Sequence, residues 1–348
     1  MKSVRSLFAT QKNIAVAIPA YNEEKTLAGT LKSLPVSAED VYVVDDGSTD
    51  KTSETASLFT RNVLSLKTNK GKAKATELLL HEFGLLDRYK FVVFSDADTQ
   101  LDRKFILETI AAFDKKTAVV VGQVSNRSRG LVSAFRAFEY TLWQAIYKNA
   151  QSTMKVIFIA PGCASIYRTE TLKRLSFDSD TLAEDADLTL QVHRRKAGWI
   201  KYASRAVVYT QDPPTVKAYF NQIVRWHSGI WQNIKKHRVP FGGQKVDFEF
   251  GYLTLEALFY PVFLLLALVL SGFYLKIFLL TLIAEVIMTA ILALFVALRK
   301  RRRDQLKYFL FFPLLRWVSS AVFFVTFVLV ILLRRSGHKW KMAPRYSD

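Results

Sequence analysis

Pairs of carboxylates follow two of the apolar runs in this chain. Asp96-Ala97-Asp98 follows Phe91–Phe94 after one serine, Ser95, and Asp45-Asp46 comes directly after Val41–Val44. Two carboxylates separated by one residue can hold a hard divalent cation, and such a cation can neutralise a diphosphate leaving group. A single carboxylate can instead accept a hydrogen bond from a ribose hydroxyl or a base N–H. Taken alone, each motif also fits a solvated turn or the cap of the following helix.

A third acidic pair, Glu184-Asp185, stands at the start of a helix that we expect over residues 183–197. A hydroxyl nucleophile must lose a proton as it attacks, and a positioned carboxylate can accept that proton. The alternative role is electrostatic, because acidic side chains in the first turn stabilise a helix through its dipole. The pattern therefore fits a general base, and it also fits stabilisation of the helix dipole.

Basic and aromatic side chains recur at helical spacing in residues 222–226. Gln222, Arg225 and Trp226 share one helical face by their i, i+3 and i+4 spacing. Arginine can bind a diphosphate with two hydrogen bonds, and tryptophan offers an apolar plane on which a ring can stack. The alternative is an interfacial helix with a Trp anchor and a snorkelling Arg. Lys70-Gly71-Lys72 precedes another predicted helix, where it can meet phosphate or form a solvated turn.

Alternating strands and helices must position these side chains. Short apolar runs predict buried strands, and the segments between them predict helices. The strands are expected over residues 14–18, 41–44, 63–66 and 91–94, and the helices over a stretch ending at residue 34, over 49–59 and over 71–84. This alternation predicts a mostly parallel sheet covered on both faces. Ligands bind outside the carboxyl ends of such strands, so Pro19–Glu23, Asp45–Ser48 and Asp96–Asp98 should line one crevice.

The second half of the chain changes character after about Lys245. Before it we expect a strand over 119–122, an amphipathic helix over 133–151 and a helix over 216–236 that lies along a membrane surface. After it, residues 252–275 and 277–298 are each apolar and long enough to cross a bilayer of about 30 Å. The basic run Arg299–Arg303 places the following loop in the cytoplasm. Residues 318–333 are short for a span, so a third crossing and a re-entrant hairpin both remain open, as does the side on which the basic tail 334–348 lies.

Composition narrows the function classes. The 348 residues carry a formal net charge of +19, with 50% hydrophobic and 23% charged residues. Apolar spans beside basic runs favour an anionic membrane surface over nucleic acid as the partner of this charge. The single cysteine, Cys163, excludes an intrachain disulfide and a zinc cluster of cysteines. Residues 1–13 lack the apolar core of a signal peptide, so we expect the catalytic part in the cytoplasm.

The order of these motifs resembles family 2 of the glycosyltransferases, the inverting GT-A enzymes that include cellulose, chitin, hyaluronan and poly-N-acetylglucosamine synthases. The matching segments run over residues 14 to about 236. They are Ile18–Glu24, Val44–Asp50, Ser95–Asp98, Pro161–Arg168, Ala183–Asp185 and Gln222–Trp226. The family's usual Thr-Glu-Asp is here Ala183-Glu184-Asp185, so the expected base is retained and the Thr hydroxyl is missing.

The resemblance implies a fold and a set of site residues. The fold would be α/β, with a Rossmann-like GT-A domain over residues 1–236, which includes the interfacial helix near 216–236, followed by transmembrane α-helices over 252–333. Asp185, with Glu184 beside it, would be catalytic, and Asp98 with Asp96 would hold Mg²⁺ or Mn²⁺. Gln222, Arg225 and Trp226 would contact acceptor and diphosphate. The nucleotide-sugar site would comprise Pro19, Ala20, Tyr21, Glu23, Asp45, Asp46, Lys72 and Asp96.

The implied activity is transfer of a sugar, such as N-acetylglucosamine or another hexose, from a UDP-sugar to a glycan. The enzyme would be a multi-pass protein of the cell membrane with its catalytic domain in the cytoplasm and no nucleic-acid partner. Processive polysaccharide synthesis, with an accessory subunit or a homo-oligomer, is one alternative. Transfer of one sugar to a lipid or lipid-linked acceptor is another, and an inactive membrane scaffold is the non-enzymatic one.

Overall fold

The computed structural model describes residues 13–126, 130–178, 180–300 and 303–335. Contacts within the chain divide these residues into two compact units. The first unit comprises residues 13–125 and 144–211, and the second comprises residues 126–143 and 212–335. The contact-based division therefore assigns helix 216–236 to the second unit, whereas the predicted catalytic domain of residues 1–236 includes it; that domain boundary stays a prediction.

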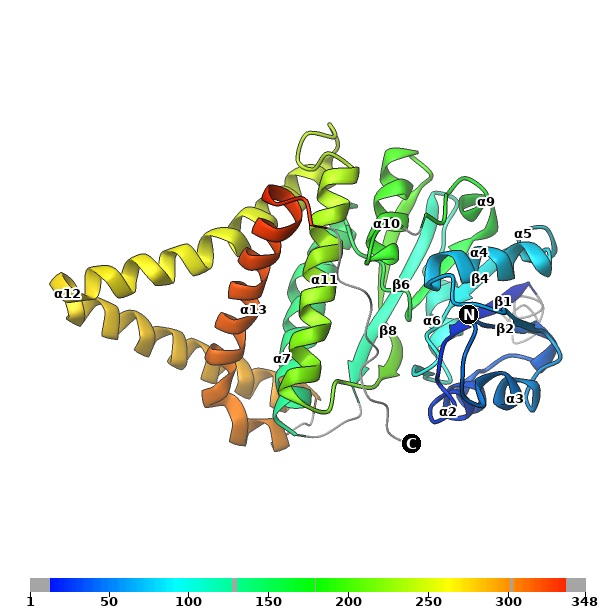
Figure 1. Cartoon of the computed structure of the whole chain (residues 1–348), viewed down its shortest axis with the longest axis horizontal. Helices are drawn as coiled ribbons and strands as arrows, with labels where there is room; N and C mark the ends of the chain where they lie inside the picture. The colour runs from blue at the N-terminus through cyan, green and yellow to red at the C-terminus, as the bar shows by residue number, and fades with distance from the viewer. Residues whose placement is uncertain (1–12, 127–129, 179, 301–302, 336–348) are drawn as a thin grey trace. The chain divides into compact units, whose positions relative to one another are not determined.

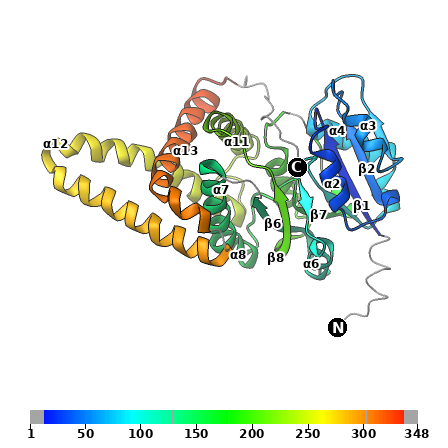
Figure 2. The same ribbon diagram turned by 90° about the horizontal axis from the view of Figure 1, so that it is seen from below.

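The first unit is built on one mixed β-sheet (Figures 1 and 2). Its strand order is β3-β2-β1-β4-β7-β6-β8-β5. The strands are β1 (Ile14–Ala20), β2 (Val41–Asp45), β3 (Val63–Ser65), β4 (Phe91–Phe94), β5 (Gln100–Leu101), β6 (Thr117–Asn126), β7 (Ser165–Arg168) and β8 (Trp199–Thr210). The first four pair in parallel, so all four run toward the same edge.

The predicted strands are confirmed, and the sheet differs from the expectation beyond β4. β7 runs antiparallel to both of its neighbours, β4 and β6, and β5 runs antiparallel to β8. β8 was not predicted because its residues are mostly half-buried or exposed, with Lys201 and Arg205 inside the strand. It therefore lacks the continuous apolar run that marks β1, whose residues Ile14–Ile18 are fully buried.

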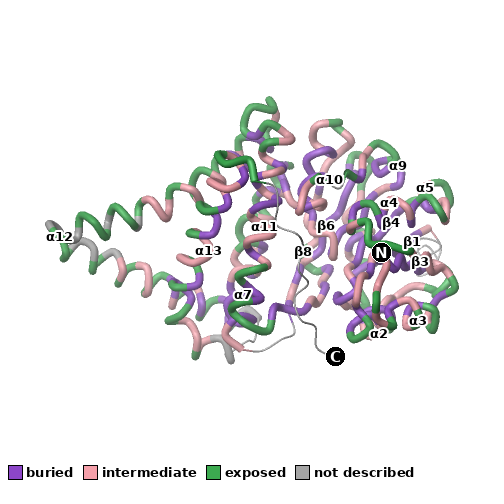
Figure 3. Tube along the Cα trace, in the orientation of Figure 1, coloured by how far each residue is buried: buried purple, intermediate pink, exposed green. Residues whose placement is uncertain are grey.

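Helices follow the parallel strands and cover the sheet. They are α2 (Leu27–Ser33), α3 (Thr52–Ser57), α4 (Lys72–Glu82), α5 (Leu85–Arg88), α6 (Phe105–Ala111), α8 (Asn149–Met154), α9 (Thr169–Leu172) and α10 (Glu184–Arg194). One apolar cluster joins α4 and α10 to the strands: Leu79 of α4 and Leu188 of α10 belong to the same core as Ala15, Tyr42 and Val119. Buried residues concentrate along the strands in Figure 3. The sheet and these two helices therefore form a rigid base for the loops at its edge.

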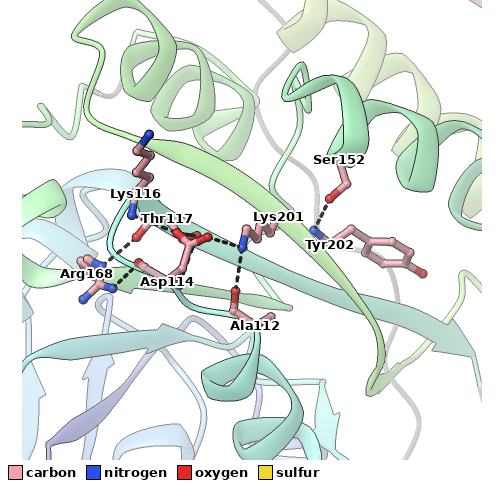
Figure 4. A network of polar contacts seen from close by, with 8 residues as sticks. All are labelled: Ala112, Asp114, Lys116, Thr117, Ser152, Arg168, Lys201 and Tyr202. Atoms are coloured by element: carbon pink, nitrogen blue, oxygen red, sulfur yellow. Dashed lines mark hydrogen bonds and ion pairs between the residues drawn. The ribbon is translucent and has the colours of Figure 1, made fainter.

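Polar contacts tie β6, β7 and β8 together on one side of the sheet (Figure 4). Arg168 of β7 donates to the carbonyl oxygens of Thr117 and Asp114, each at 2.7 Å. The Nζ of Lys201 on β8 lies 2.6 Å from Oδ2 of Asp114, and this exposed pair holds the pKa of Asp114 well below its usual range. These bonds fix the reversed strand β7 in its place.

The second unit is helical. Its elements are α7 (Leu131–Leu142), α11 (Val216–Lys236), α12 (Lys245–Lys300), a 3₁₀ segment (Arg303–Phe311), α13 (Phe312–Phe327) and a π-helical turn (Val328–Leu332). The predicted helix 133–151 is helical throughout, but it consists of α7, a π-helical segment (Trp143–Lys148) and α8. Phe135, Tyr219, Ala293 and Phe312 share the core of this unit.

α12 runs out to a tip and returns, as Figures 1 and 2 both show. The two arms meet where Tyr260 donates to Oε1 of Glu285 at 2.5 Å, and Trp317 of α13 donates to the same carboxylate at 3.1 Å. Two helical stretches, Lys245–Leu270 and Leu306–Leu332, are long and apolar enough to cross a membrane, and Leu282–Leu298 is a shorter apolar helix. Only 6% and 28% of the most apolar windows of the two long stretches are buried, whereas the core helix of a soluble protein would be mostly buried.

Candidate active site

One pocket at the carboxyl edge of the sheet collects residues from five separate segments of the first unit. Its lining includes Pro19, Lys72, Asp96, Gly162, Glu184 and Asp185. Pro19 belongs to β1, Asp96 follows β4, Lys72 begins α4, and the acidic pair begins α10. Of the crevice predicted at the ends of the parallel strands, Pro19 and Asp96 line this pocket together with the acidic pair of α10, whereas Asp45–Ser48, Tyr21, Glu23 and Asp98 are not among its lining residues.

Lys72 is the cation at the centre of this pocket. Its Nζ lies 2.6 Å from Oδ1 of Asp96 and 2.9 Å from Oε1 of Glu184. Burial disfavours the charged ammonium, but the two carboxylates outweigh that effect and hold the pKa of Lys72 well above its usual range. A Cβ atom on Gly162 would lie only 3.1 Å from the same Nζ, so the glycine leaves room for the lysine.

Asp96 and Asp98 are the carboxylates predicted to hold the metal ion. Asp98 is buried, and its Oδ1 accepts a hydrogen bond from Thr99 at 3.2 Å. The ammonium of Lys72 against Asp96 shows that a positive charge is accommodated here, and carboxylate oxygens suit Mg²⁺ or Mn²⁺. The donor set therefore fits the predicted ion.

The carboxylates after β2 hold the neighbouring loops. Oδ1 of Asp45 accepts from the backbone N–H of Ser48 at 2.9 Å. Asp46 is buried, and its two oxygens accept from the N–H groups of Lys70 at 2.7 Å and Gly71 at 2.9 Å. Burial raises the pKa of Asp46, and these two hydrogen bonds oppose that rise. Asp46 therefore fixes the turn that precedes Lys72, a role for it beyond the predicted contact with the nucleotide.

The loop after β1 is pinned to the loop after β2. Asn22 has a left-handed backbone with φ of 54° and donates its N–H to Oγ of Ser48 at 2.9 Å. Its side-chain oxygen accepts from the N–H of Thr49 at 2.8 Å. Glu23 is buried and accepts from the hydroxyl of Thr26 at 2.6 Å. Glu23 thus has a local structural role, while buried Ala20 and half-buried Tyr21 complete the predicted segment.

Asp185 is the carboxylate predicted to act as the general base. It lies in the first turn of α10, where the N–H of Ala186 donates to its Oδ1 at 2.8 Å. Burial, reinforced by the negative charge of Glu184, raises the pKa of Asp185 to about 6, and Lys72 opposes the rise. A carboxylate with this pKa is mostly ionised at neutral pH and is a stronger base than an ordinary aspartate.

Two further groups near this carboxylate were not predicted. Lys148, at the end of the π-helical segment, donates to the carbonyl of Ile159 at 3.1 Å. Burial lowers the pKa of Lys148 to about 8, against the attraction of Asp185. Burial also raises the pKa of the Cys163 thiol, which the charge of Asp96 reinforces. The one sequence signal for them is that Cys163 belongs to the Pro161–Arg168 motif; Lys148 belongs to no motif.

The predicted residues of α11 belong to the second unit. Trp226 is half-buried, and the guanidinium carbon of Arg136 lies 4.6 Å from its ring centre. Oε1 of Gln222 is buried without a hydrogen-bond partner among the residues that the structure describes. Arg225 is half-buried on the same helix. The roles of these three residues stay predictions.

A second acidic group lies apart from the predicted metal ligands. Carboxylate oxygens of Asp178, Asp180 and Asp187 lie within 4.8 Å of one another, and Asp187 accepts from Gln191 at 2.9 Å. The first two are exposed, as acidic clusters on protein surfaces commonly are. The hydrogen bond between Asp187 and Gln191 lies within α10, so Asp187 has a structural role that differs from the role predicted for Asp185.

Comparison with known proteins gives related sequences and a related fold. Residues 15–176 match the family described as Glycosyl transferase family 2. A poly-beta-1,6-N-acetyl-D-glucosamine synthase of Staphylococcus epidermidis is 28% identical over 255 residues, which cover 68% of this chain and 61% of that protein. The synthase of that name from strain RP62A is 26% identical over 98% of this chain and 89% of its own length. A solved structure of the mannosyltransferase PcManGT from Pyrobaculum calidifontis, in complex with GDP-Man and Mn²⁺, has a TM-score of 0.63 at 18% identity, over 90% of this chain and 87% of that one.

Proposed function

We propose that this chain, whose residues 15–176 match the family described as Glycosyl transferase family 2, is a glycosyltransferase that transfers N-acetylglucosamine from UDP-N-acetylglucosamine to a glycan hydroxyl with inversion at the anomeric carbon. The observation that carries the proposal is the pocket in which Lys72, Asp96 and Asp185 converge from three distant segments. The choice of sugar is supported by the relatives named poly-beta-1,6-N-acetyl-D-glucosamine synthase. The choice of UDP is supported by the resemblance of the motifs.

The reaction needs one base and a stabilised leaving group. Asp185 accepts the proton of the acceptor hydroxyl, whose oxygen bonds to the anomeric carbon as the bond from that carbon to the diphosphate oxygen breaks. UDP leaves with the electron pair of the broken bond, and Lys72 offers its ammonium to the negative charge that develops on the diphosphate. The half-buried carboxylate of Asp185, with its pKa of about 6, suits the first step.

Asp96 and Asp98 would hold Mg²⁺ or Mn²⁺ in this proposal. When bound, such an ion neutralises diphosphate charge and so makes UDP a better leaving group. Asp46 contributes indirectly, because its two backbone hydrogen bonds fix the turn from which Lys72 projects. Pro19, Ala20, Tyr21 and Asp45 would surround the nucleoside, since they lie on the same edge of the sheet as the pocket.

The second unit would anchor the enzyme in the cell membrane. Exposed apolar side chains along α12, such as Phe259, Leu265 and Ile283, have more than half of their surface exposed, which favours contact with lipid over water. The relatives named as polymer synthases favour repeated transfer to a growing glycan. Gln222, Arg225 and Trp226 on α11 would serve the acceptor and the diphosphate, as their motif predicts.

The test is a screen of nucleotide release with the full-length protein in detergent or lipid nanodiscs. UDP-N-acetylglucosamine, UDP-glucose, UDP-galactose and GDP-mannose are each supplied with Mg²⁺, with Mn²⁺ and with EDTA. We expect UDP release from UDP-N-acetylglucosamine with a divalent cation, and a ladder of products by mass spectrometry. Preference for GDP-mannose would contradict the proposed donor, and a single added sugar would contradict polymer synthesis. Absence of nucleotide release from every donor would contradict the proposal that the protein is an enzyme.

A further inference from the structure

Lys72 bridges two carboxylates that belong to different elements. Asp96 follows β4 and Glu184 begins α10, and both accept from the same ammonium, at 2.6 Å and 2.9 Å. Asp96 is also one of the two residues with which the proposed enzyme would hold its cation. The ammonium therefore occupies an oxygen ligand that the metal would use.

The local structure holds the lysine in this place. Asp46 fixes the preceding turn by accepting from Lys70 and Gly71, and Gly71 has a φ of 86° that glycine adopts without strain. Gly162 leaves room for the ammonium, since a Cβ there would approach Nζ to 3.1 Å. Three separate features thus place one positive charge beside Asp96.

The bond is nonetheless easy to exchange. The side chains of Lys72, Asp96 and Glu184 are 39%, 35% and 19% exposed, and ion pairs with such access to water contribute little to stability. An ammonium is a compact charge on a flexible stem, so it can turn from a carboxylate to a phosphate without a change of backbone.

We propose that Lys72 competes with the divalent cation for Asp96 until a nucleotide diphosphate binds and takes the ammonium as its own partner, so that metal and nucleotide enter together. Glu184 acts as a positioning residue, because it holds the ammonium beside Asp96 from the α10 side. This inference rests on the metal site of the proposed function. Free metal ions would then bind weakly to the empty enzyme, and nucleotide would raise the affinity of the site for them.

The proposal predicts opposite effects of one substitution on two ligands. Removing the charge with Lys72→Met should tighten Mn²⁺ binding to the nucleotide-free protein by about tenfold, because the competing cation is gone. The same substitution should weaken UDP binding measured in EDTA by about tenfold, because the diphosphate loses its partner. A lysine that served only the stability of the fold would weaken both.

Mn²⁺ binding is measured by electron paramagnetic resonance of the free ion, and UDP binding by calorimetry, with the full chain in detergent. Lys74→Met is the matched control, since Lys74 lies on the same helix and pairs with Glu77 at 2.5 Å on the surface. It should leave both affinities unchanged. Lys72→Arg keeps the charge and guards against a folding defect in Lys72→Met; it should bind Mn²⁺ as weakly as the wild type.

Unchanged or weaker Mn²⁺ binding by Lys72→Met, with the control at wild-type values, would overturn the proposal. Unchanged UDP affinity in EDTA would overturn it as well, because the exchange of partners would be absent. Neither measurement contains a sugar donor. A protein that failed to transfer any sugar would contradict the proposed function while leaving both binding results readable.

Discussion

Each unit contains a cation paired with a carboxylate, and the two cations differ in burial and in their partners. Lys72 in the first unit has 39% of its side chain exposed and two carboxylates within 3 Å. Arg136 in the second unit is 4% exposed, and its guanidinium contacts Glu139 at 2.8 Å and the hydroxyl of Tyr140 at 2.6 Å. The rings of Tyr140 and Trp226 lie 4.3 Å and 4.6 Å from the guanidinium carbon.

The difference teaches how each cation is used. Burial disfavours the charge of Arg136, but Tyr140 and Glu139 outweigh it and hold the pKa of the guanidinium above its usual range. A planar guanidinium stacked between rings loses several contacts at once if it moves, whereas an ammonium exchanges one oxygen for another. Lys72 is therefore placed for exchange with a ligand, and Arg136 is placed to fix the packing of α7 against α11.

The largest effect should come from the base in the first unit. Asp185→Asn removes the proton acceptor and should lower the rate of sugar transfer by about 10²–10⁴-fold, with little change in thermal stability. Initial rates of UDP release and a melting curve measure the two quantities. Asp187→Asn, two residues along the same helix, should retain activity because its carboxylate bonds Gln191 instead. Full activity in Asp185→Asn would contradict the assignment of Asp185 as the proton acceptor.

The second prediction concerns stability, and it compares the free energies of unfolding of an Arg136 variant and a Lys72 variant. Arg136→Met leaves the carboxylate of Glu139 without its cation and should lower the free energy of unfolding by about 3 kcal/mol. Lys72→Met should lower it by less than about 1 kcal/mol, because its ion pairs are partly exposed. Denaturant titrations in the same detergent, followed by tryptophan fluorescence, compare the two variants directly. Equal losses would show that the two cations serve the same purpose.

The third prediction concerns pH. A general base must be ionised, and the pKa of Asp185 is raised to about 6, so its ionised fraction falls as pH falls through 6. The transfer rate should therefore drop about tenfold per pH unit below that value. Glu184→Gln removes the like charge that helps to raise this pKa, so the acid limb should move to lower pH. If the acid limb of the pH–rate profile stays in place in Glu184→Gln, the limb does not report the ionisation of Asp185.

The smallest effect should come from Gly162→Ala. The added methyl group would approach the ammonium of Lys72 to 3.1 Å, so the side chain must shift by a few tenths of an ångström. If the lysine competes for Asp96, Mn²⁺ binding to the nucleotide-free protein should tighten by about twofold, with stability changed by less than about 1 kcal/mol. Weaker Mn²⁺ binding in this variant would contradict the exchange mechanism.

The sequence predicted the parallel part of the sheet well, because β1, β2 and β4 are continuous apolar runs that end in polar motifs. Its motifs also include Pro19, Asp96, Glu184 and Asp185, which line the pocket, whereas Asp45–Ser48 was predicted in the same crevice and does not line it. It did not predict β8, whose half-exposed residues give no apolar run, or the reversal of β7, which depends on pairing with β4 and β6. The antiparallel part of the sheet therefore depends on tertiary contacts that the local sequence pattern does not record.

The contacts of Lys72 and Arg136 could not be predicted from the sequence either. Lys72 meets Glu184 across 112 positions of the chain, a pairing that no local spacing records. Arg136 lies in no motif, and only its i, i+3 relation to Glu139 on an otherwise apolar helix could have marked it. Asp46 was predicted beside the nucleotide from its motif, and its bonds to the Lys70–Gly71 turn became visible only in three dimensions.

The position of β4 in the sheet offers a junction for building hybrid enzymes. All strands on one side of β4 precede it in the sequence, and all strands on the other side follow it. A single crossover after Asp98 would therefore join the nucleotide end of one parent, with Pro19, Lys72 and Asp96, to the α10 carboxylates of another. Recombination between relatives at this point keeps β3, β2, β1 and β4 of one parent together, while the shared core combines residues of both parents, such as Leu79 with Leu188.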